Sequence, residues 1–214
     1  MKETVKEILD RYCEKNSIVA KLKEKIYAAA VMICDCYRSG GKLLICGNGG
    51  SCADADHIVG ELVKGFVKKR PLSVGDKDRF KEYGDSAAVL ADRLQYSLPA
   101  INLCAQSSLI TAVINDIGGN EIFAQQVIGY GKPGDILIGI STSGNSTDII
   151  NASYAAKANG LKTIAVSGRD GGKMNEIFDL SIIVPLNITS DIQDCHSVIY
   201  HALCEMTEAE FFDE

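Results

Sequence analysis

No apolar run in this sequence is long enough to cross a membrane, and the longest runs have the length of a β-strand. The first ten residues, MKETVKEILD, are charged and lack the apolar core of a secretory signal. An excess of basic residues is also missing. The formal net charge is −6, whereas nonspecific binding to a nucleic-acid backbone requires a basic surface. A local basic patch stays open, but we expect a cytoplasmic protein that binds neither nucleic acid nor membrane.

Several familiar motifs are absent. No CxxC pair occurs among the eight scattered cysteines, which fits reduced thiols better than disulfides. Cys34 and Cys36 lie two residues apart but have no second pair with which to form a zinc knuckle. Neither a P-loop nor the spacing of a dinucleotide fingerprint is present, and no internal repeat of fixed period is found. These absences argue against a nucleotide-binding site.

The sequence does contain apolar runs that alternate with helix-period segments. At 214 residues and 46% hydrophobic composition, the chain can bury a full core as a single domain, 1–214. The runs are nearly continuous and rich in β-branched residues, which predicts an α/β fold with a five-stranded parallel sheet between two helical layers, a three-layer sandwich. The expected strands are Leu43–Cys46, Ala100–Cys104, Ile136–Ser141, Thr163–Ser167 and Leu180–Pro185.

Two helical regions flank this core, Glu3–Arg38 within the N-terminal 1–40 and Asp191–Phe212 at the C-terminus. Their apolar positions exceed what one sheet can cover, which favours packing against another subunit. The segment 71–98 interrupts the βα rhythm with a polar, charged stretch that contains a helix-like Ser86–Leu94. It is either a surface excursion, the alternative we favour, or a lid over the site.

A Gly-rich turn joins the first expected strand to a helix in CGNGGSCADADHIVGE. Its glycines let the backbone approach a ligand, while Ser51 can cap the helix and offer its hydroxyl to phosphate oxygens. His57 and Glu61 are four residues apart, so both project from one helical face, where they could share a metal, a proton or a substrate oxygen. Taken alone, the turn could merely reverse the chain and the pair could be a solvated surface.

A second loop of the same kind follows the third expected strand in GISTSGNST. Hydroxyl groups surround Gly144 and Asn145, and Ser146 or Thr147 could cap the next helix. In open parallel sheets, ligands bind beyond the carboxyl ends of the strands, where both loops fall. Phosphate held by hydroxyls and amides, without a nucleotide motif, indicates a sugar phosphate. The hydroxyls are those of Ser141, Thr142, Ser143 and Ser146.

Five motifs in order make this chain resemble the SIS (sugar isomerase) domain family, and within it the sedoheptulose 7-phosphate isomerases, also called phosphoheptose isomerases. They lie between Gly41 and His201 and read CGNGGS with HxxxE, VINDIGGNEIF, GISTSGNS, SGRDGGKM and IQDCHSVIYH. The resemblance implies the flavodoxin-like SIS fold. It also implies conversion of sedoheptulose 7-phosphate to D-glycero-D-manno-heptose 7-phosphate through an enediol, in homotetramers whose active sites are built across subunits.

Residue roles follow from the same resemblance. Glu61 and His201 match the proton-transferring pair, a combination that spans the useful pKa range for aldose–ketose exchange. Several members bind zinc at positions that match His57, Glu61, Gln193 and His201. Of the three histidines in the chain, His196 is expected to be structural and to point elsewhere. The substrate-contacting positions match Asn48, Gly49, Gly50, Ser51, Asn115, Asp116, Ser141, Thr142, Ser143, Ser146 and Gln193.

The chain departs from the family pattern in two places. Gly65 stands where many members have an arginine, so that a cation is lost or moved to Lys64. The long excursion after Arg70 is absent from compact members. These departures leave three alternatives open: a phosphoheptose isomerase, an isomerase of another phosphosugar, and a noncatalytic SIS module that senses phosphosugars or acts as a scaffold. Retention of Glu61, Gln193 and His201 favours an enzyme.

Overall fold

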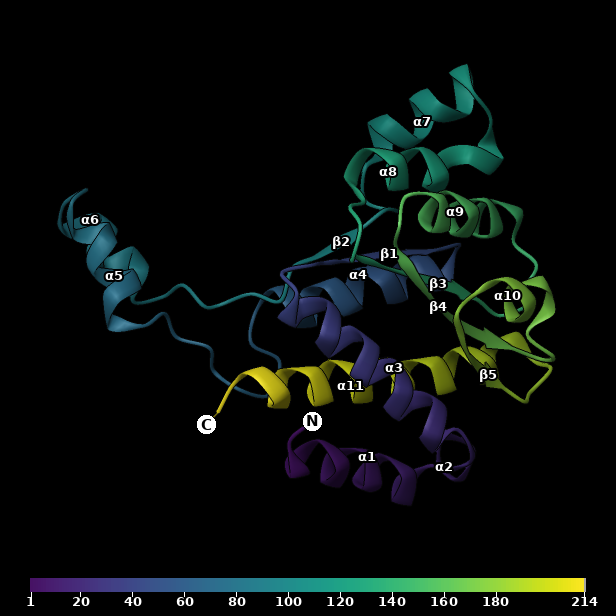
Figure 1. Cartoon of the computed structure of the whole chain (residues 1–214), viewed down its shortest axis with the longest axis horizontal. Coiled ribbons are helices and arrows are strands. Elements are labelled where there is room, and N and C mark those ends of the chain that lie inside the picture. Colours follow the sequence, from purple (N-terminus) through teal and green to yellow (C-terminus); the bar gives the residue numbers. More distant parts are fainter. Residues whose placement is uncertain (214) are drawn as a thin grey trace.

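A five-stranded, wholly parallel sheet forms the centre of the structure, a computed structural model that describes residues 1–213 (Figure 1). All five predicted strands are confirmed, with ends that differ from the prediction by one or two residues at most. The order across the sheet is β2-β1-β3-β4-β5. The strands are β1 Leu43–Gly47, β2 Ala100–Asn102, β3 Ile136–Ser141, β4 Lys162–Gly168 and β5 Leu180–Val184.

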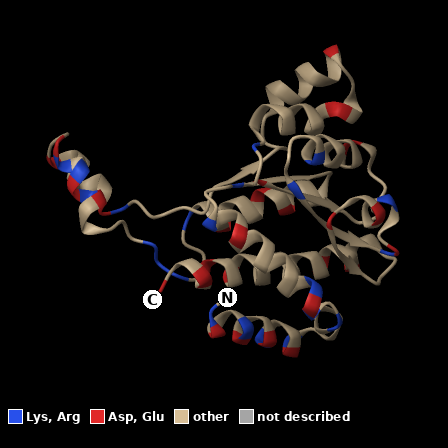
Figure 2. Cartoon of the chain, viewed as in Figure 1, with Lys and Arg blue, Asp and Glu red and all other residues tan. Residues whose placement is uncertain are grey.

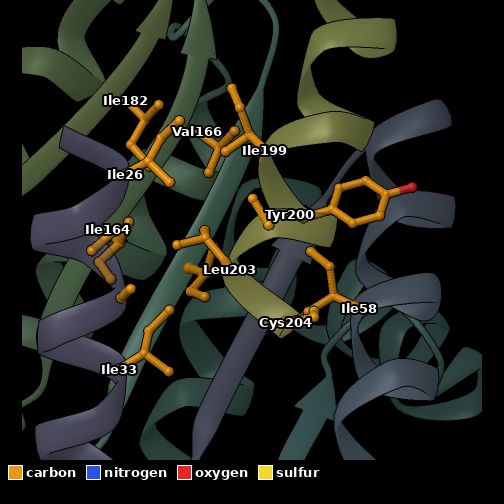
Figure 3. Packing of buried hydrophobic residues seen from close by; sticks show 14 of the residues in the cluster. Ile26, Ile33, Ile58, Ile164, Val166, Ile182, Ile199, Tyr200, Leu203 and Cys204 are labelled. Atoms are coloured by element: carbon orange, nitrogen blue, oxygen red, sulfur yellow. The ribbon is translucent and has the colours of Figure 1, made fainter. Parts of the chain in front are cut away.

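The strands carry apolar residues on both faces because helices cover both. Leu43 and Ile45 belong to one apolar cluster, and Leu44 and Cys46 to a second cluster on the opposite face. The first cluster lies under α3 Lys23–Arg38, α4 Gly50–Val63 and α11 Thr189–Phe211 (Figure 3). It continues to α1 Glu3–Lys15, which packs on the outside of α11. The second lies under α8 Ile122–Tyr130, α9 Thr147–Ala158 and α10 Gly172–Ile177. The expected three-layer arrangement is therefore confirmed.

The N-terminal helical region is broken into three helices. α1 ends at Lys15, and the side chain of Asn16 accepts hydrogen bonds from the backbone N–H groups of Ile18 and Val19, which starts α2 Ser17–Lys21. α1 packs against the C-terminal helix α11 and buries Val5 and Leu9. Part of the apolar surface of the two terminal regions is thus covered within the chain.

The excursion forms a helical hairpin that projects from the rest of the molecule, and we call its residues 72–94 the arm (Figure 1). α5 Val74–Lys81 and α6 Asp85–Ala91 pack against each other. α6 lies within the expected helical stretch except for its first residue, whereas α5 was not predicted. An antiparallel bridge between Pro71 and Gln95 closes the base of the arm. Lysines and arginines alternate with acidic residues along it (Figure 2), and its role as a lid stays a prediction.

The connections place the two predicted loops side by side. β1 pairs with β2 on one side and with β3 on the other, so the strand order reverses between β1 and β3. Ligands of open parallel sheets bind at such a switch point. The glycine-rich loop follows β1 and the hydroxyl-rich loop follows β3. No helix among residues 1–213 is long and apolar enough to span a bilayer.

Candidate active site

The loop after β1 turns into α4 through Gly49, which has a φ of 57°. This left-handed conformation favours glycine. Gly49 is the N-cap residue, so the prediction that Ser51 caps this helix is wrong: Ser51 lies one residue inside the helix and is buried. Asn48, Gly49 and Gly50 are exposed and remain available to a ligand.

Gly50 also brings the C-terminal helix into the site. A Cβ atom built at Gly50 would lie 2.3 Å from the side-chain nitrogen of Gln193 on α11. Any larger residue would displace this amide. The glycine thus lets α11 approach the start of α4, and it places the Gln193 amide beside the first loop.

The loop after β3 gathers three of its predicted hydroxyl groups. The Oγ atom of Ser141 lies 2.9 Å from that of Ser146 and 3.5 Å from that of Ser143. Ser146 is the N-cap residue of α9, as one of the two predicted alternatives, but its side chain makes no capping hydrogen bond. The hydroxyls therefore turn toward one another at the start of a helix, where backbone N–H groups favour an anion.

A bridge connects the two loops. The side-chain amide of Asn48 donates to both carboxylate oxygens of Asp148, at 3.1 and 2.9 Å. Asp148 lies in the first turn of α9, so this contact joins the end of β1 to the end of β3. Asp148 was not predicted as a site residue, because nothing in its local sequence indicates a partner a hundred positions away.

The SGRDGGKM motif packs against the hydroxyl-rich loop and forms hydrogen bonds with it. Gly144 has a φ of 66°, and a Cβ atom there would lie 1.9 Å from the carbonyl oxygen of Gly171. The backbone N–H of Met174 donates to the carbonyl of Gly144, and that of Lys173 donates to the side chain of Asn145. This motif thus fixes the shape of the loop. Beside it is an open cavity lined by Ser143, Asn145, Arg169, Asp170, Pro185 and Asn187.

About two turns after the start of α4, the predicted acid–base residues Glu61 and His201 both lie close to His57. Its Nε2 atom lies 3.2 Å from Oε1 of Glu61 and 3.4 Å from Nε2 of His201. The Glu61 side chain is only 15% exposed. Lys64 lies 3.3 Å from the other carboxylate oxygen of Glu61. Lys64 thus supplies a cation beside Glu61 in the segment where the family arginine is missing.

Tyr200 orients this cluster although sequence reasoning did not select it. Its hydroxyl lies 3.1 Å from Nδ1 of His57, and Figure 3 shows it pointing away from the apolar side chains that surround the ring. Burial, with a contribution from Asp54, raises the pKa of Tyr200 to about 12. The phenol therefore stays protonated at neutral pH. Burial and the neighbouring His57 lower the pKa of His201, which favours its neutral imidazole.

The donors at this cluster are partly suited to zinc. A tetrahedral ion with bonds of about 2.0–2.1 Å holds its ligand atoms about 3.3–3.4 Å apart. Both separations from His57, to Glu61 and to His201, are close to that value. Among residues 1–213, however, no group of three or more His, Cys, Asp or Glu side chains is arranged to hold a metal ion. The distances from His57 to Glu61 and to His201 therefore fit zinc, but a full set of zinc ligands is not assembled among the described residues.

Within one chain, Asn115 and Asp116 do not lie at the cluster of His57, Glu61 and His201. They lie exposed at the end of α7 Ser107–Asp116, which packs against the short helix η1 Gly119–Glu121 and against α8. The side-chain amide of Asn115 donates to Asp116 at 2.7 Å, and no hydrogen bond joins either to the two loops among the described residues.

Comparison with known proteins identifies the family of this chain. A model of the SIS domain family matches residues 6–76 and 81–168, a match interrupted within the arm. A phosphoheptose isomerase from Geobacter sp. (strain M21) is 37% identical over 213 residues, which cover 99% of this chain and 98% of that protein. The phosphoheptose isomerase structure from Neisseria gonorrhoeae has a TM-score of 0.73 at 31% identity and covers 95% of this chain and 97% of its own. That from Francisella tularensis has a TM-score of 0.74 at 29% identity, with coverage of 98% and 100%.

The fold, the two loops at the switch point and the family match define a SIS domain protein. The similarity also extends beyond the domain type, because it spans nearly the full length of both this chain and its relatives. Within the SIS domain family, the chain belongs to the phosphoheptose isomerases.

Proposed function

We propose that this protein is an aldose–ketose isomerase that converts sedoheptulose 7-phosphate into D-glycero-D-manno-heptose 7-phosphate. The observation that carries this proposal is the 37% identity with a phosphoheptose isomerase across 99% of the chain. The His57, Glu61 and His201 cluster supports it, because isomerisation through an enediol needs a base beside the carbonyl carbon and a second group for the oxygen protons.

In this proposal the substrate lies along α4. The hydroxyls of the loop after β3 and the N-termini of α4 and α9 hold the phosphate. His57 follows Gly50 by seven residues, which corresponds to about 10 Å of helix at a rise of about 1.5 Å per residue. An extended heptose can span such a distance, which would place its carbonyl end at the cluster.

Glu61 is proposed to remove the proton from the carbon next to the carbonyl and to return it to the neighbouring carbon. Its largely buried side chain suits a general base, since partial exclusion of water strengthens the interaction with the substrate. His201 is proposed to move protons between the two substrate oxygens, a task that a neutral imidazole performs as donor or acceptor. Lys64 and His57 would keep Glu61 oriented.

Zinc is proposed to bind to His57, Glu61, Gln193 and His201. When bound, it would supply a positive charge that polarises the substrate carbonyl. The separations around His57 support this assignment in part. To complete the ligand set, the Gln193 side chain, which lies beside Gly50, would have to move along α4 toward His57.

The active form is proposed to be a homotetramer with sites shared between subunits. The position of α7 supports this, since the side chains of Asn115 and Asp116 are exposed and, among the described residues, hydrogen-bonded only to each other. In a shared site, these two polar side chains would meet the substrate held by another copy.

The direct test is isomerisation of sedoheptulose 7-phosphate by the purified protein, followed by NMR in deuterated water. We expect aldose formation with deuterium incorporated at the carbon that exchanges its proton. The assay is repeated after chelation and after adding zinc, and the expected result is lost turnover that zinc restores. Turnover that survives chelation would reject the zinc proposal while leaving acid–base catalysis intact.

Absence of turnover by folded, zinc-loaded protein would reject this substrate. A panel of other phosphosugars then separates the two remaining alternatives. Turnover of another aldose or ketose phosphate would identify a different isomerase. A ligand-induced rise in melting temperature without turnover would identify a noncatalytic phosphosugar-binding module.

A further inference from the structure

A buried ion pair lies behind the proposed acid–base residues. The side chains of Arg70 and Glu208 are fully excluded from solvent, and Nε of Arg70 donates to Oε1 of Glu208 at 2.8 Å. Burying two charges is costly unless their remaining hydrogen-bonding atoms are also satisfied. Arg70 meets this condition by donating to the carbonyl of Leu62 at 2.6 Å and to that of Glu61 at 3.2 Å.

The carboxylate of Glu208 accepts its other hydrogen bonds from the segment that follows α4. It accepts hydrogen bonds from the backbone N–H groups of Phe66 and Val67 at 2.8 Å and of Lys68 at 3.0 Å. One carboxylate on α11 therefore holds three successive amides and the guanidinium of Arg70. The pair thus fastens the last turn of α4, together with the chain that follows it, to α11.

This connection is the last of three between helices that run in the same direction. Gly50 approaches Gln193 at the start of α4, and His57 meets His201 further along. At the end of the helix, Arg70 joins the carbonyls of α4 to Glu208. Glu208 follows His201 by seven residues, two helical turns, so both lie on similar faces of α11. The ion pair therefore fixes the helix segment that carries Glu61 relative to the one that carries His201.

We propose that Arg70 and Glu208 are positioning residues that hold the Glu61 carboxylate at its working distance from His201. This inference rests on the proposed isomerase function. Neither residue touches the substrate. They act through the backbone of Glu61, and a displacement of about 1 Å in such an arrangement can lower catalysis by about 100-fold.

A second ion pair on the same helix, half-exposed rather than buried, provides a control for the packing of α11. Arg11 pairs with Glu205, which precedes Glu208 by less than one turn of α11. This pair joins α11 to α1, and Tyr12 of α1 also donates to Glu205. None of its hydrogen bonds reaches α4 among the described residues. Substitution of Arg11 therefore tests the effect of weakening the contact between α11 and α1 without a change beside Glu61.

The experiment compares full-length Arg70→Lys, Glu208→Gln and Arg11→Lys with the wild-type enzyme. Lysine keeps the charge but cannot serve Glu208 and both carbonyls at once. For Arg70→Lys we expect kcat to fall by about 100-fold while KM stays within about threefold, since the phosphate loops lie at the other end of α4. Glu208→Gln keeps the shape and should lower kcat by about tenfold. Arg11→Lys should leave kcat within about twofold.

Circular dichroism and melting temperatures establish that each variant is folded at the assay temperature. A folded Arg70→Lys or Glu208→Gln enzyme with wild-type kcat would overturn the inference, as would an equal loss of kcat in Arg11→Lys. Failure of both Arg70→Lys and Glu208→Gln to fold would also overturn it, because the pair would then be a folding requirement. If the wild-type protein itself turned over no phosphosugar, the proposed function would fail first, which is a distinguishable result.

Discussion

His196 and His201 lie on the same helix but in opposite surroundings. His196 is fully buried, with Nε2 at 3.1 Å from the carbonyl of Ser167 and with no hydrogen-bond partner for Nδ1 among residues 1–213. His201 lies at the surface of the helix against His57. The expectation that His196 is structural is confirmed. Five positions along a helix rotate a side chain by about 140°, enough to separate a core residue from a site residue.

Protonation of His196 should weaken the fold in acid. Burial lowers its pKa, so the unfolded chain binds a proton that the folded protein excludes. The stability is therefore fully present above the unfolded pKa of about 6.5 and is lost as the pH falls below it, by up to about 1.4 kcal/mol per pH unit. His196→Gln, which can still donate to Ser167, should reduce this slope. Urea unfolding between about pH 5 and pH 7.5 measures it, and equal slopes in both proteins would contradict the prediction.

Glu61→Gln should separate binding from chemistry. The amide keeps the shape of the side chain but cannot accept a proton, so turnover should fall by at least about 100-fold. Phosphosugar affinity should change little, because the hydroxyl loop is untouched. Isothermal titration and the NMR assay measure the two effects. Glu82→Gln, an exposed carboxyl on the arm, is the control, and unchanged turnover in Glu61→Gln would reject Glu61 as the base.

At the scale of the single residue, the sequence predicts the residues within motifs better than the residues that contact and orient them. His57 and Glu61 are four apart on one helix, so their proximity follows from helical geometry alone. The partners of Tyr200, Asp148 and Glu208 lie far away in the chain, and only the folded packing of α4, α9 and α11 brings them together. Their roles could not be derived from local spacing.

Secondary-structure elements were predictable where burial on both faces leaves a continuous apolar run. β3 was predicted at its observed limits because every residue from Ile136 to Ser141 is buried. α5 was missed because it buries none of its residues and shows no apolar period. A local signal was nevertheless present: the Ser73 side chain accepts a hydrogen bond from the backbone N–H of Asp76, as expected for a helix start.

Removal of the arm should leave the rest of the fold intact. Among the residues of α5 and α6, only Ala91 is buried, so little apolar contact is lost. Pro71 and Gln95 already form an antiparallel bridge, and an Asn-Gly turn can join them in place of residues 72–94. Arg70 and Tyr96 are retained. We expect a melting temperature within about 4 °C of the wild type and kcat within about threefold. A large loss of kcat in the folded variant would instead support a lid that acts on the site.

At the scale of the whole molecule, three large apolar side chains in or next to α7 and α8 are exposed to solvent. Ile114, Ile117 and Ile128 are 51%, 58% and 56% exposed. Isolated exposed residues are ordinary, but exposed isoleucines at 114 and 117, on either side of Asn115 and Asp116 in the sequence, suit an interface. Ile114 lies in α7 and Ile128 in α8, two helices that pack on each other, and Ile117 is the C-cap residue of α7. A homotetramer with shared sites would cover them and bring the polar pair to a neighbouring subunit.

Ile117→Glu should therefore weaken assembly and catalysis together. A carboxylate introduced into an apolar interface loses its hydration without gaining a partner, which opposes association. If the proposed tetramer forms through this surface, light scattering coupled to size exclusion should show a smaller assembly than the wild type, and turnover per chain should fall in proportion to the assembly lost. Val74→Glu is the control, because Val74 is 77% exposed on the arm. If Ile117→Glu kept the same assembly size as the wild type, α7 would not be at an interface. If it dissociated and kept full turnover, each chain would hold a complete site, and Asn115 and Asp116 would have no part in a neighbour's chemistry.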